Sequence, residues 1–318
     1  MKRSWLTLGA CTALVLASGV AAVATVSAGA SQAVTAAQAR ADGDGPTGFW
    51  YGTDSATVPV PGRAPYSTPI IGGAYGGYIG MTGNWANLAG CHKIVVWSAA
   101  NSAQANTNYL VYHKGIGTGV YWFMGGPGVD PHYNGTAKEA TAWGQLQAAR
   151  TLYDIGHVHV TYPVVFMDIE IPGNAPNYTP APDNGWNAVY TSACSGVVKQ
   201  AFVPTALDRA DLNGFAAYLT AHSSCKVGVY SAPSVWASIF GTGRDSLIPN
   251  TYEWTYWPET SSLSNAPQGW RLKNGQYAQF FGGQAYNSKY ALMWQWSGGG
   301  GIRNGVGDFD QIDANRRG

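Results

Sequence analysis

The sequence has little charge of either sign. Charged residues make up 11% of its 318 positions, and 18 lysines and arginines nearly balance 17 aspartates and glutamates. Proteins that bind polyanions carry an excess of basic residues, so we expect no nucleic-acid partner. Histidines are also few, six in all. The pair His157 and His159 precedes the central apolar strand and favours structural or surface histidines, so we expect no metal and no cofactor.

The N-terminal segment has the pattern of an export signal. Lys2 and Arg3 precede an uncharged apolar run from Leu6 to Val26, and small residues follow near Ala28. A basic start, an apolar stretch and a small-residue cleavage site define a secretory signal peptide. We therefore assign residues 1–28 to a signal peptide and 29–47 to a disordered leader. The protein is expected to be secreted, extracellular or cell wall-associated, touching the membrane only through its signal segment.

Cysteine is scarce, and three of the four cysteines, Cys91, Cys194 and Cys225, follow the signal segment. Exported proteins use disulfides, so we expect one here. We predict Cys194–Cys225, which would join the segment after an acidic strand to the start of the next strand. Cys91 would then be a buried thiol, although other pairings stay open.

Aromatic residues are abundant, with 13 tryptophans and 19 tyrosines among few charges. Their rings suit the C–H faces of sugars, which favours a neutral, ring-shaped ligand. Residues 48–318 are long enough for one barrel-sized domain, and we expect a monomer.

The chain is organised around residues 163–170. Four apolar residues lead into Asp168 and Glu170, and Pro172 ends the run. A continuous apolar run of this length predicts a strand buried on both faces. Residues two apart share a strand face, so the two carboxylates should project together at the carboxyl end of a core strand. Barrel and open α/β enzymes keep their chemistry at that edge.

The remaining periodicities predict an α/β protein in which strands and helices alternate before strands alone follow one another, as in a barrel. In one helix, Ala142, Leu146, Ala149 and Tyr153 are expected to form the buried face. Segment 56–90 is predicted to be an irregular loop with a hairpin at 77–81. The predicted strands are 49–55, 93–98, 119–124, 163–170, 226–231, 251–257, 290–297 and 305–312; the predicted helices are 136–154, 187–200, 208–222 and 234–240.

Six segments in chain order resemble glycoside hydrolase family 25 lysozymes and their secreted glycoside-hydrolase-like relatives. Among these segments, Asp168–Glu170 matches the family's Asp-x-Glu pair. Two positions differ from the family pattern, since Trp122 replaces a histidine and Ile312 an asparagine. The segments are Tyr51–Ser55, Gly119–Phe123, Asp168–Glu170, Val227–Ser231, Trp294–Ser297 and Phe309–Ile312.

The resemblance implies an irregular TIM-type barrel, with about five β/α units followed by three mostly β units. It also implies that Glu170 is the general acid and Asp168 its charge partner, because glycosidic cleavage needs a proton donor and a negative charge near the oxocarbenium-like centre. The implied further catalytic residues are Asp54 and Asp310, with Asp308 as a shifted alternative, and the candidate substrate-binding residues are Tyr121, Tyr230, Trp257 and Trp294.

The sequence thus favours a secreted glycosidase of the lysozyme or N-acetylmuramidase type, acting on a β-1,4-linked amino-sugar polymer such as peptidoglycan. Two alternatives stay open. One is a non-catalytic relative that binds cell-wall glycan. The other is a protein-interaction barrel without a sugar site.

Overall fold

A computed structural model describes residues 49–55, 78–91, 118–155, 163–171, 182–194, 196–242, 250–257, 279–281, 290–297 and 308–313. The predicted signal peptide, leader and strand 93–98 lie outside these residues. Within the described part of the chain, no helix is both long and apolar enough to span a bilayer.

Eight strands form the central sheet, and each pairs with two neighbours so that the sheet closes into a barrel. All neighbouring pairs from β1 to β9 are parallel, and β10 closes the ring as an antiparallel strand between β9 and β1. The predicted α/β class with a mainly parallel sheet is therefore confirmed. In barrel order the strands are β1 (Phe49–Ser55), β2 (Tyr78–Asn84), β3 (Thr118–Phe123), β4 (Val164–Asp168), β7 (Lys226–Ser231), β8 (Tyr252–Tyr256), β9 (Ala291–Ser297) and β10 (Asp308–Asp313).

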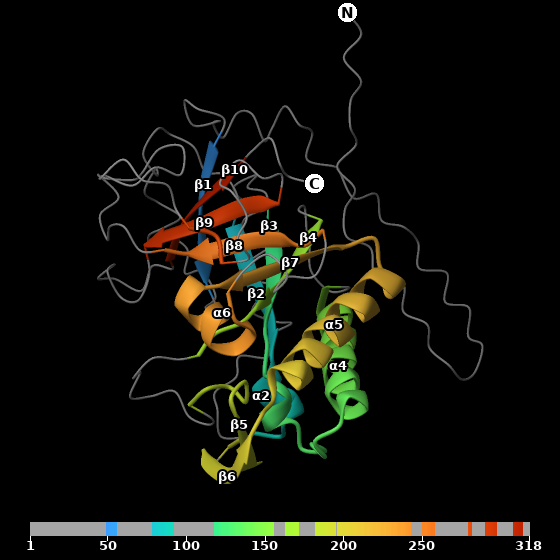
Figure 1. The fold of residues 1–318 in the computed structure, drawn as a ribbon. Helices are drawn as coiled ribbons and strands as arrows, with labels where there is room; N and C mark the ends of the chain where they lie inside the picture. The colour runs from blue at the N-terminus through green and yellow to red at the C-terminus, as the bar shows by residue number, and fades with distance from the viewer. Residues whose placement is uncertain are drawn as a thin grey trace, which may run out of the picture.

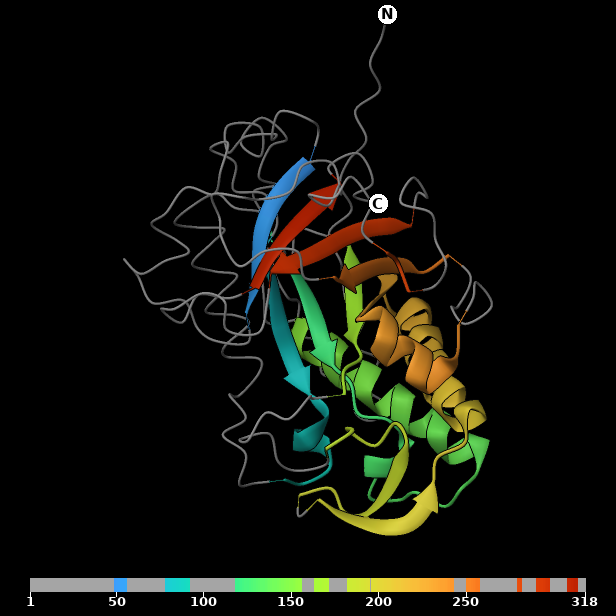
Figure 2. The same cartoon turned by 60° about the vertical axis from the view of Figure 1, so that its left-hand side comes forward.

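Helices cover one side of this barrel, and a small hairpin extends beyond it (Figure 1). The helices are α2 (Trp85–Leu88), α4 (Ala137–Ile155), α5 (Thr205–His222) and α6 (Pro233–Phe240), with a short 3-10 turn at Pro127–Val129. The hairpin pairs β5 (Ala188–Ser192) with β6 (Val197–Phe202). Figure 2 shows that β2 and β3 run toward the end of the molecule where α2 and the hairpin lie.

Strand β4 is buried on both faces, as predicted. All five of its residues are buried. Val165 and Met167 pack with Leu152 and Phe215 of the helical layer, whereas Phe166 belongs to a second cluster inside the barrel. The alternation of side chains along a strand thus gives β4 one face toward the helices and one toward the barrel interior.

Helix α4 begins as predicted but buries a different face. The Glu139 amide donates a hydrogen bond to Thr136 Oγ1 at 3.2 Å, which is the expected cap. The predicted face is wrong, because Leu146 and Tyr153 are about half exposed. The buried side of α4 instead carries Trp143, Gly144, Gln147, Ala148, Thr151 and Leu152.

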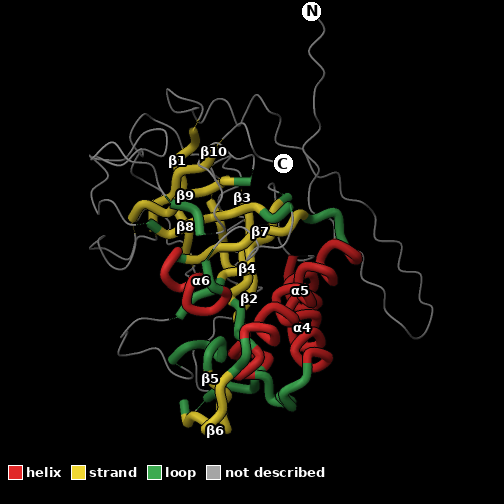
Figure 3. Tube along the Cα trace, viewed as in Figure 1, coloured by secondary structure: helices red, strands yellow, loops and turns green. Residues whose placement is uncertain are grey.

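Small and polar residues define that side because α4 crosses α5 at close range; the two helices lie side by side in Figure 3. A Cβ added to Gly144 would lie 2.0 Å from the Asp211 carbonyl oxygen, and one added to Gly214 would lie 2.3 Å from that of Thr141. Glycine is therefore required on both helices. The predicted helix 208–222 is confirmed within α5, where Leu212, Phe215, Ala216 and Leu219 are buried at helical spacing.

Two local predictions are wrong. Residues 187–200 form the β5–β6 hairpin rather than a helix. The β-branched pair Val197 and Val198 favours a strand, and Gly196, with φ of +65°, permits the turn before it. Residues 78–84 form the barrel strand β2 between β1 and β3, not half of a local hairpin.

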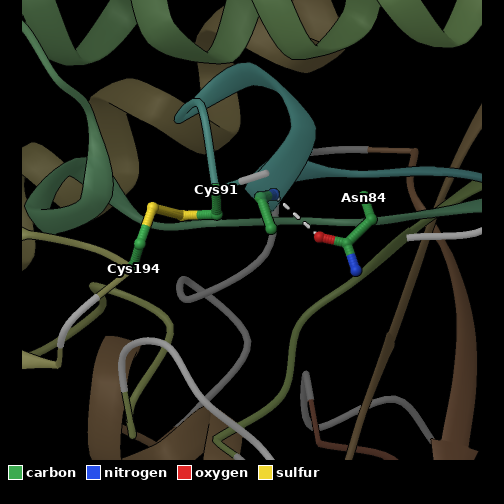
Figure 4. The surroundings of a disulfide bond; sticks show 4 residues. Asn84, Cys91 and Cys194 are labelled. Carbon is green, nitrogen blue, oxygen red and sulfur yellow. Dashed lines mark hydrogen bonds between the residues drawn. A yellow bond between two sulfur atoms is a disulfide. The ribbon is translucent and has the colours of Figure 1, made fainter. Parts of the chain in front are cut away.

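The predicted disulfide is also wrong, because Cys194 pairs with Cys91, with Cα atoms 5.0 Å apart (Figure 4). Cys91 follows β2 and α2, on the same side of the barrel as the hairpin that carries Cys194. Cys225 lies at the opposite end, directly before β7. Helix α5, 18 residues long, spans about 27 Å at 1.5 Å per residue, far beyond the Cα separation that a disulfide permits.

The helix crossing gives a first prediction. Gly214→Ala should lower the free energy of unfolding by about 1–3 kcal/mol, the usual cost of overpacking, when measured by urea denaturation. A helical alanine in open space would instead stabilise the protein by up to about 1 kcal/mol. A gain in stability would therefore contradict the close crossing.

The disulfide gives a second prediction. Replacing Cys91 and Cys194 by serine should lower the free energy of unfolding by about 2–5 kcal/mol, because the bond closes a long loop. Peptide mapping without reduction should recover the peptides containing Cys91 and Cys194 joined together. A peptide in which Cys194 is joined to Cys225 would refute the pairing.

Candidate active site

The candidate site begins at the carboxyl end of β4. Asp168 is the last residue of the strand and is 6% exposed. Alternation places it on the same face as Phe166, toward the barrel interior, while Met167 and Ile169 pack with the outer helical layer. Glu170 follows two residues later and is partly exposed. A buried acid at the end of β4 is therefore followed, two residues beyond it, by a more open acid; that their side chains project together stays a prediction.

Hydrogen bonds from neighbouring segments hold this strand end. The Met124 amide donates to the Asp168 carbonyl at 2.9 Å, and the Ile169 amide to the Tyr230 carbonyl at 2.9 Å. The Ser231 hydroxyl donates to the Ile169 carbonyl at 2.9 Å. Beyond the strand, Asn184 Nδ2 donates to the Glu170 carbonyl at 2.7 Å. The backbone of 168–170 is thus fixed from β3, from β7 and from the loop before the hairpin.

Aromatic rings fill the barrel interior beneath the acids. Trp254 of β8 is their common partner, with centroids 5.8 Å from Tyr121, 5.4 Å from Phe166 and 4.4 Å from Tyr230. The Tyr230 hydroxyl donates to Gln295 Oε1. Tyr121 and Tyr230, two predicted sugar-binding residues, therefore lie inside the barrel, and both are 6% exposed.

The other two predicted acids lie across the barrel. Asp54 is near the carboxyl end of β1 and pairs with Asp308 of β10, while Asp310 pairs with Gly52 and with Gln295. Because β1 is parallel to its neighbours through to β4, the carboxyl ends of these strands lie at one end of the barrel. Register thus places Asp54 and Asp310 at the same end of the barrel as Asp168.

Trp257 and Trp294, both predicted to bind substrate, differ in their exposure and contacts. Trp294 of β9 is fully buried, and its indole Nε1 donates to the Trp257 carbonyl at 2.8 Å. Trp257 directly follows β8 and is partly exposed. Trp294 therefore supports the segment from which the Trp257 ring is presented.

Sequence reasoning missed Asn184, which joins two of the loops at this end. It has φ of +54°, and its carbonyl accepts from the Gly126 amide at 2.8 Å while its side chain holds Glu170. The Asn184-Gly185 dipeptide is a turn signal and was the available clue. Among the described residues, no group of three or more histidines, cysteines or acids is arranged to hold a metal ion.

A second set of acids is buried where α4, α5 and the loop after β3 meet. Asp211 is fully buried, Asp208 is 1% exposed and Asp130 is 7% exposed. Burial raises the pKa of Asp208 to about 9, with the nearby Asp183 adding to the effect. Burial and the charges of Asp208 and Asp130 raise the pKa of Asp211 well above its ordinary value. Both shifts favour the protonated form of these two carboxyls in the folded protein.

Comparisons with known proteins give a structural likeness only. No protein-family model matches the sequence, and no curated protein matches it significantly. The chain is similar in structure to a bacterial lysozyme from Streptomyces coelicolor, at 14% identity over 84% of this chain and 94% of that one, with a TM-score of 0.45.

Two fungal structures give similar values. They are a muramidase from Acremonium alcalophilum (15% identity, 84% of this chain and 96% of that one, TM-score 0.45) and a family GH25 lysozyme from Aspergillus fumigatus (14%, 83% and 93%, TM-score 0.40). The likeness to family 25 lysozymes expected from the sequence is confirmed for the overall chain; it assigns no role to any residue.

The buried acids give a third prediction, that stability falls as pH rises. An acid whose pKa is raised by folding stabilises the folded state fully below its unfolded value, near 3.8, and loses that contribution as pH approaches its folded value. For Asp208 this window runs from about pH 4 to about 9. The melting temperature should therefore be higher at pH 5 than at pH 8.5.

Asp208→Asn combined with Asp211→Asn should flatten this dependence and raise the melting temperature at pH 8.5, because neither of these two side chains can then ionise. Asp154→Asn is the matched control. Asp154 is also buried but pairs with Arg150 at 3.2 Å. The melting temperature of Asp154→Asn should therefore still fall between pH 5 and pH 8.5. An unchanged slope in the double variant would disprove the assignment.

Proposed function

We propose that this protein is an exported glycoside hydrolase that cleaves a β-1,4-linked amino-sugar polymer, peptidoglycan being the expected substrate. The observation that carries the proposal is the pair at the end of β4. Asp168 faces the barrel interior and is buried, and Glu170 is partly exposed two residues later. The ordered sequence motifs support the same proposal.

In the proposed mechanism Glu170 protonates the leaving glycosidic oxygen. Asp168 supplies the negative charge that stabilises the oxocarbenium-like centre. The hydrogen bonds to the carbonyls of 168–170 keep the two acids in a fixed relation, which pre-orients them for the reaction. Asp54 and Asp310 would bind hydroxyl or acetamido groups from the other side of the barrel.

The aromatic residues would form the sugar-binding walls. Trp257, partly exposed, is the member best placed to stack on a sugar ring, with Trp294 behind it. Tyr121 and Tyr230 would form the floor beneath the acids. The wider architecture that accompanies this proposal is an irregular TIM-type barrel in a secreted monomer; the N-terminal sequence pattern supports export.

The fourth prediction tests the general acid. The full-length mature protein should release reducing ends and soluble muropeptides from purified peptidoglycan, and Glu170→Gln should lower the rate about a hundredfold or more, the usual contribution of a general acid. Glu139→Gln makes the same chemical change on the first turn of α4 and should leave the rate unchanged.

If neither wild type nor Glu170→Gln releases products, the hydrolase proposal fails, and a pulldown on the same glycan decides between the alternatives. Retention on the glycan without cleavage would identify a wall-binding protein that has lost catalysis. Absence of retention would leave the protein-interaction barrel.

A further inference from the structure

The amino-terminal end of the barrel contains a cavity that the proposed hydrolase does not use. Its volume is about 670 Å³, and it lies between α5 and the starts of β7, β8 and β9. Lys226 and Tyr252 are the first residues of β7 and β8, and Tyr290 directly precedes β9. Asp168 is the last residue of the parallel strand β4, so the cavity and the acid pair lie at opposite ends of the barrel.

Thr251, which lines this cavity, has a buried hydroxyl without a hydrogen-bond partner among the described residues. Thr251 is 1% exposed, and its Oγ1 makes no hydrogen bond in the described structure. Buried hydroxyls are nearly always hydrogen-bonded. Thr251 Oγ1 is covered by its surroundings, so a ligand pairs with it only when the side chain turns toward the cavity. Thr220 lines the same cavity but donates to the Ala216 carbonyl at 2.9 Å. Of these two hydroxyls, that of Thr220 is therefore paired and that of Thr251 is unpaired among the described residues.

The cavity has one cationic side chain, that of Lys226, and no aspartate or glutamate lines it. The Lys226 ammonium lies 5.9 Å from the centroid of the Tyr252 ring, and no ion pair of Lys226 is found among the described residues. A cation–π contact leaves the positive charge uncompensated. The lining therefore favours an anionic group in the ligand and disfavours a cation.

The remaining lining is suited to a hydroxylated ring. Tyr252 and Tyr290 are partly exposed and stand edge to face, with centroids 5.4 Å apart. The Tyr290 hydroxyl donates to Asn250 Oδ1, which orients the Asn250 amide at the cavity. Two phenol rings provide apolar faces, and the amide and the Thr251 hydroxyl provide neutral hydrogen-bonding groups. A volume of this size falls within the range of small-molecule sites.

We propose that this cavity is a second ligand site that takes a sugar ring bearing a carboxylate. The carboxylate binds Lys226, the ring packs on Tyr252 and Tyr290, and a ring hydroxyl pairs with Thr251. The proposal is independent of the hydrolase proposal, because the two sites share no residue.

The test uses two acidic sugars, each beside its neutral parent: methyl β-D-glucuronide with methyl β-D-glucoside, and N-acetylmuramic acid with N-acetylglucosamine. Each is titrated into the full ¹⁵N-labelled mature protein while amide shifts are followed. At least one acidic sugar should bind about tenfold more tightly than its parent, as expected for a hydrogen bond to a charged group. The shifts should centre on Lys226 and on residues 250–252.

Variants then locate the site. Lys226→Gln should reduce binding of the acidic sugar to the level of the neutral parent, and Thr251→Val should weaken it about fivefold, the value of a neutral hydrogen bond. Thr220→Val and Glu170→Gln should both leave it unchanged. Lys226 is partly exposed, so its replacement preserves folding and keeps the test decisive even if Thr251→Val unfolds.

The proposal is overturned if no acidic sugar binds, if acid and neutral sugars bind equally, or if Lys226→Gln has no effect. Binding that is lost in Glu170→Gln but kept in Lys226→Gln would place the sugar at the opposite end of the barrel and would also overturn it, while supporting the proposed active site.

Discussion

The carboxyl end of the barrel depends on one buried amide, that of Gln147 on α4. Its Oε1 accepts from Trp122 Nε1 at 3.1 Å and from the Gly125 amide at 3.0 Å. Its Nε2 donates to the Gly125 carbonyl at 2.9 Å and to Asp211 Oδ1 at 3.4 Å. All four hydrogen-bonding positions of the amide are thus occupied. A single side chain joins β3, the loop after it, α4 and α5.

The consequences reach the candidate site through the backbone. Gly125 directly follows Met124, whose amide holds the Asp168 carbonyl. Gly125 also accepts from Trp143 Nε1 at 2.8 Å, so two side chains of α4 fix its position. The strand end that carries the acid pair is therefore held by the helical layer outside the barrel as well as by the adjacent strands. Replacing the Gln147 amide with an apolar group would leave several buried polar groups unpaired at once, which is costly because these groups are removed from solvent.

The same residues show how far sequence reasoning extends. Strand β4 was predictable because a short continuous apolar run fits a strand buried on both faces. Helix α5 was predictable because its apolar residues follow the helical period. Helix α4 was misread because its buried face includes Gly144, Gln147 and Thr151, which enter no apolar pattern. These residues form a packing surface only when α5 lies against them. The predictions for residues 187–200 and for the disulfide were wrong for a related reason. The β5–β6 hairpin and the Cys91–Cys194 bond both depend on which loops meet at one end of the barrel. Strand periodicity does not encode which loops meet.

Asp211 explains how a polar helix crossing can be stable. Its Oδ1 accepts from Gln147, while its Oδ2 has no partner in the described structure. An ionised carboxylate here would lie close to the acids Asp208 and Asp130 with one bond to an amide, an arrangement that burial makes unfavourable. The neutral acid carries no charge and keeps the Oδ1 bond to Gln147, while its hydroxyl still requires an acceptor. The crossing therefore combines close backbone contact at Gly144 and Gly214 with a carboxyl whose protonated form is favoured by burial and by the neighbouring acids.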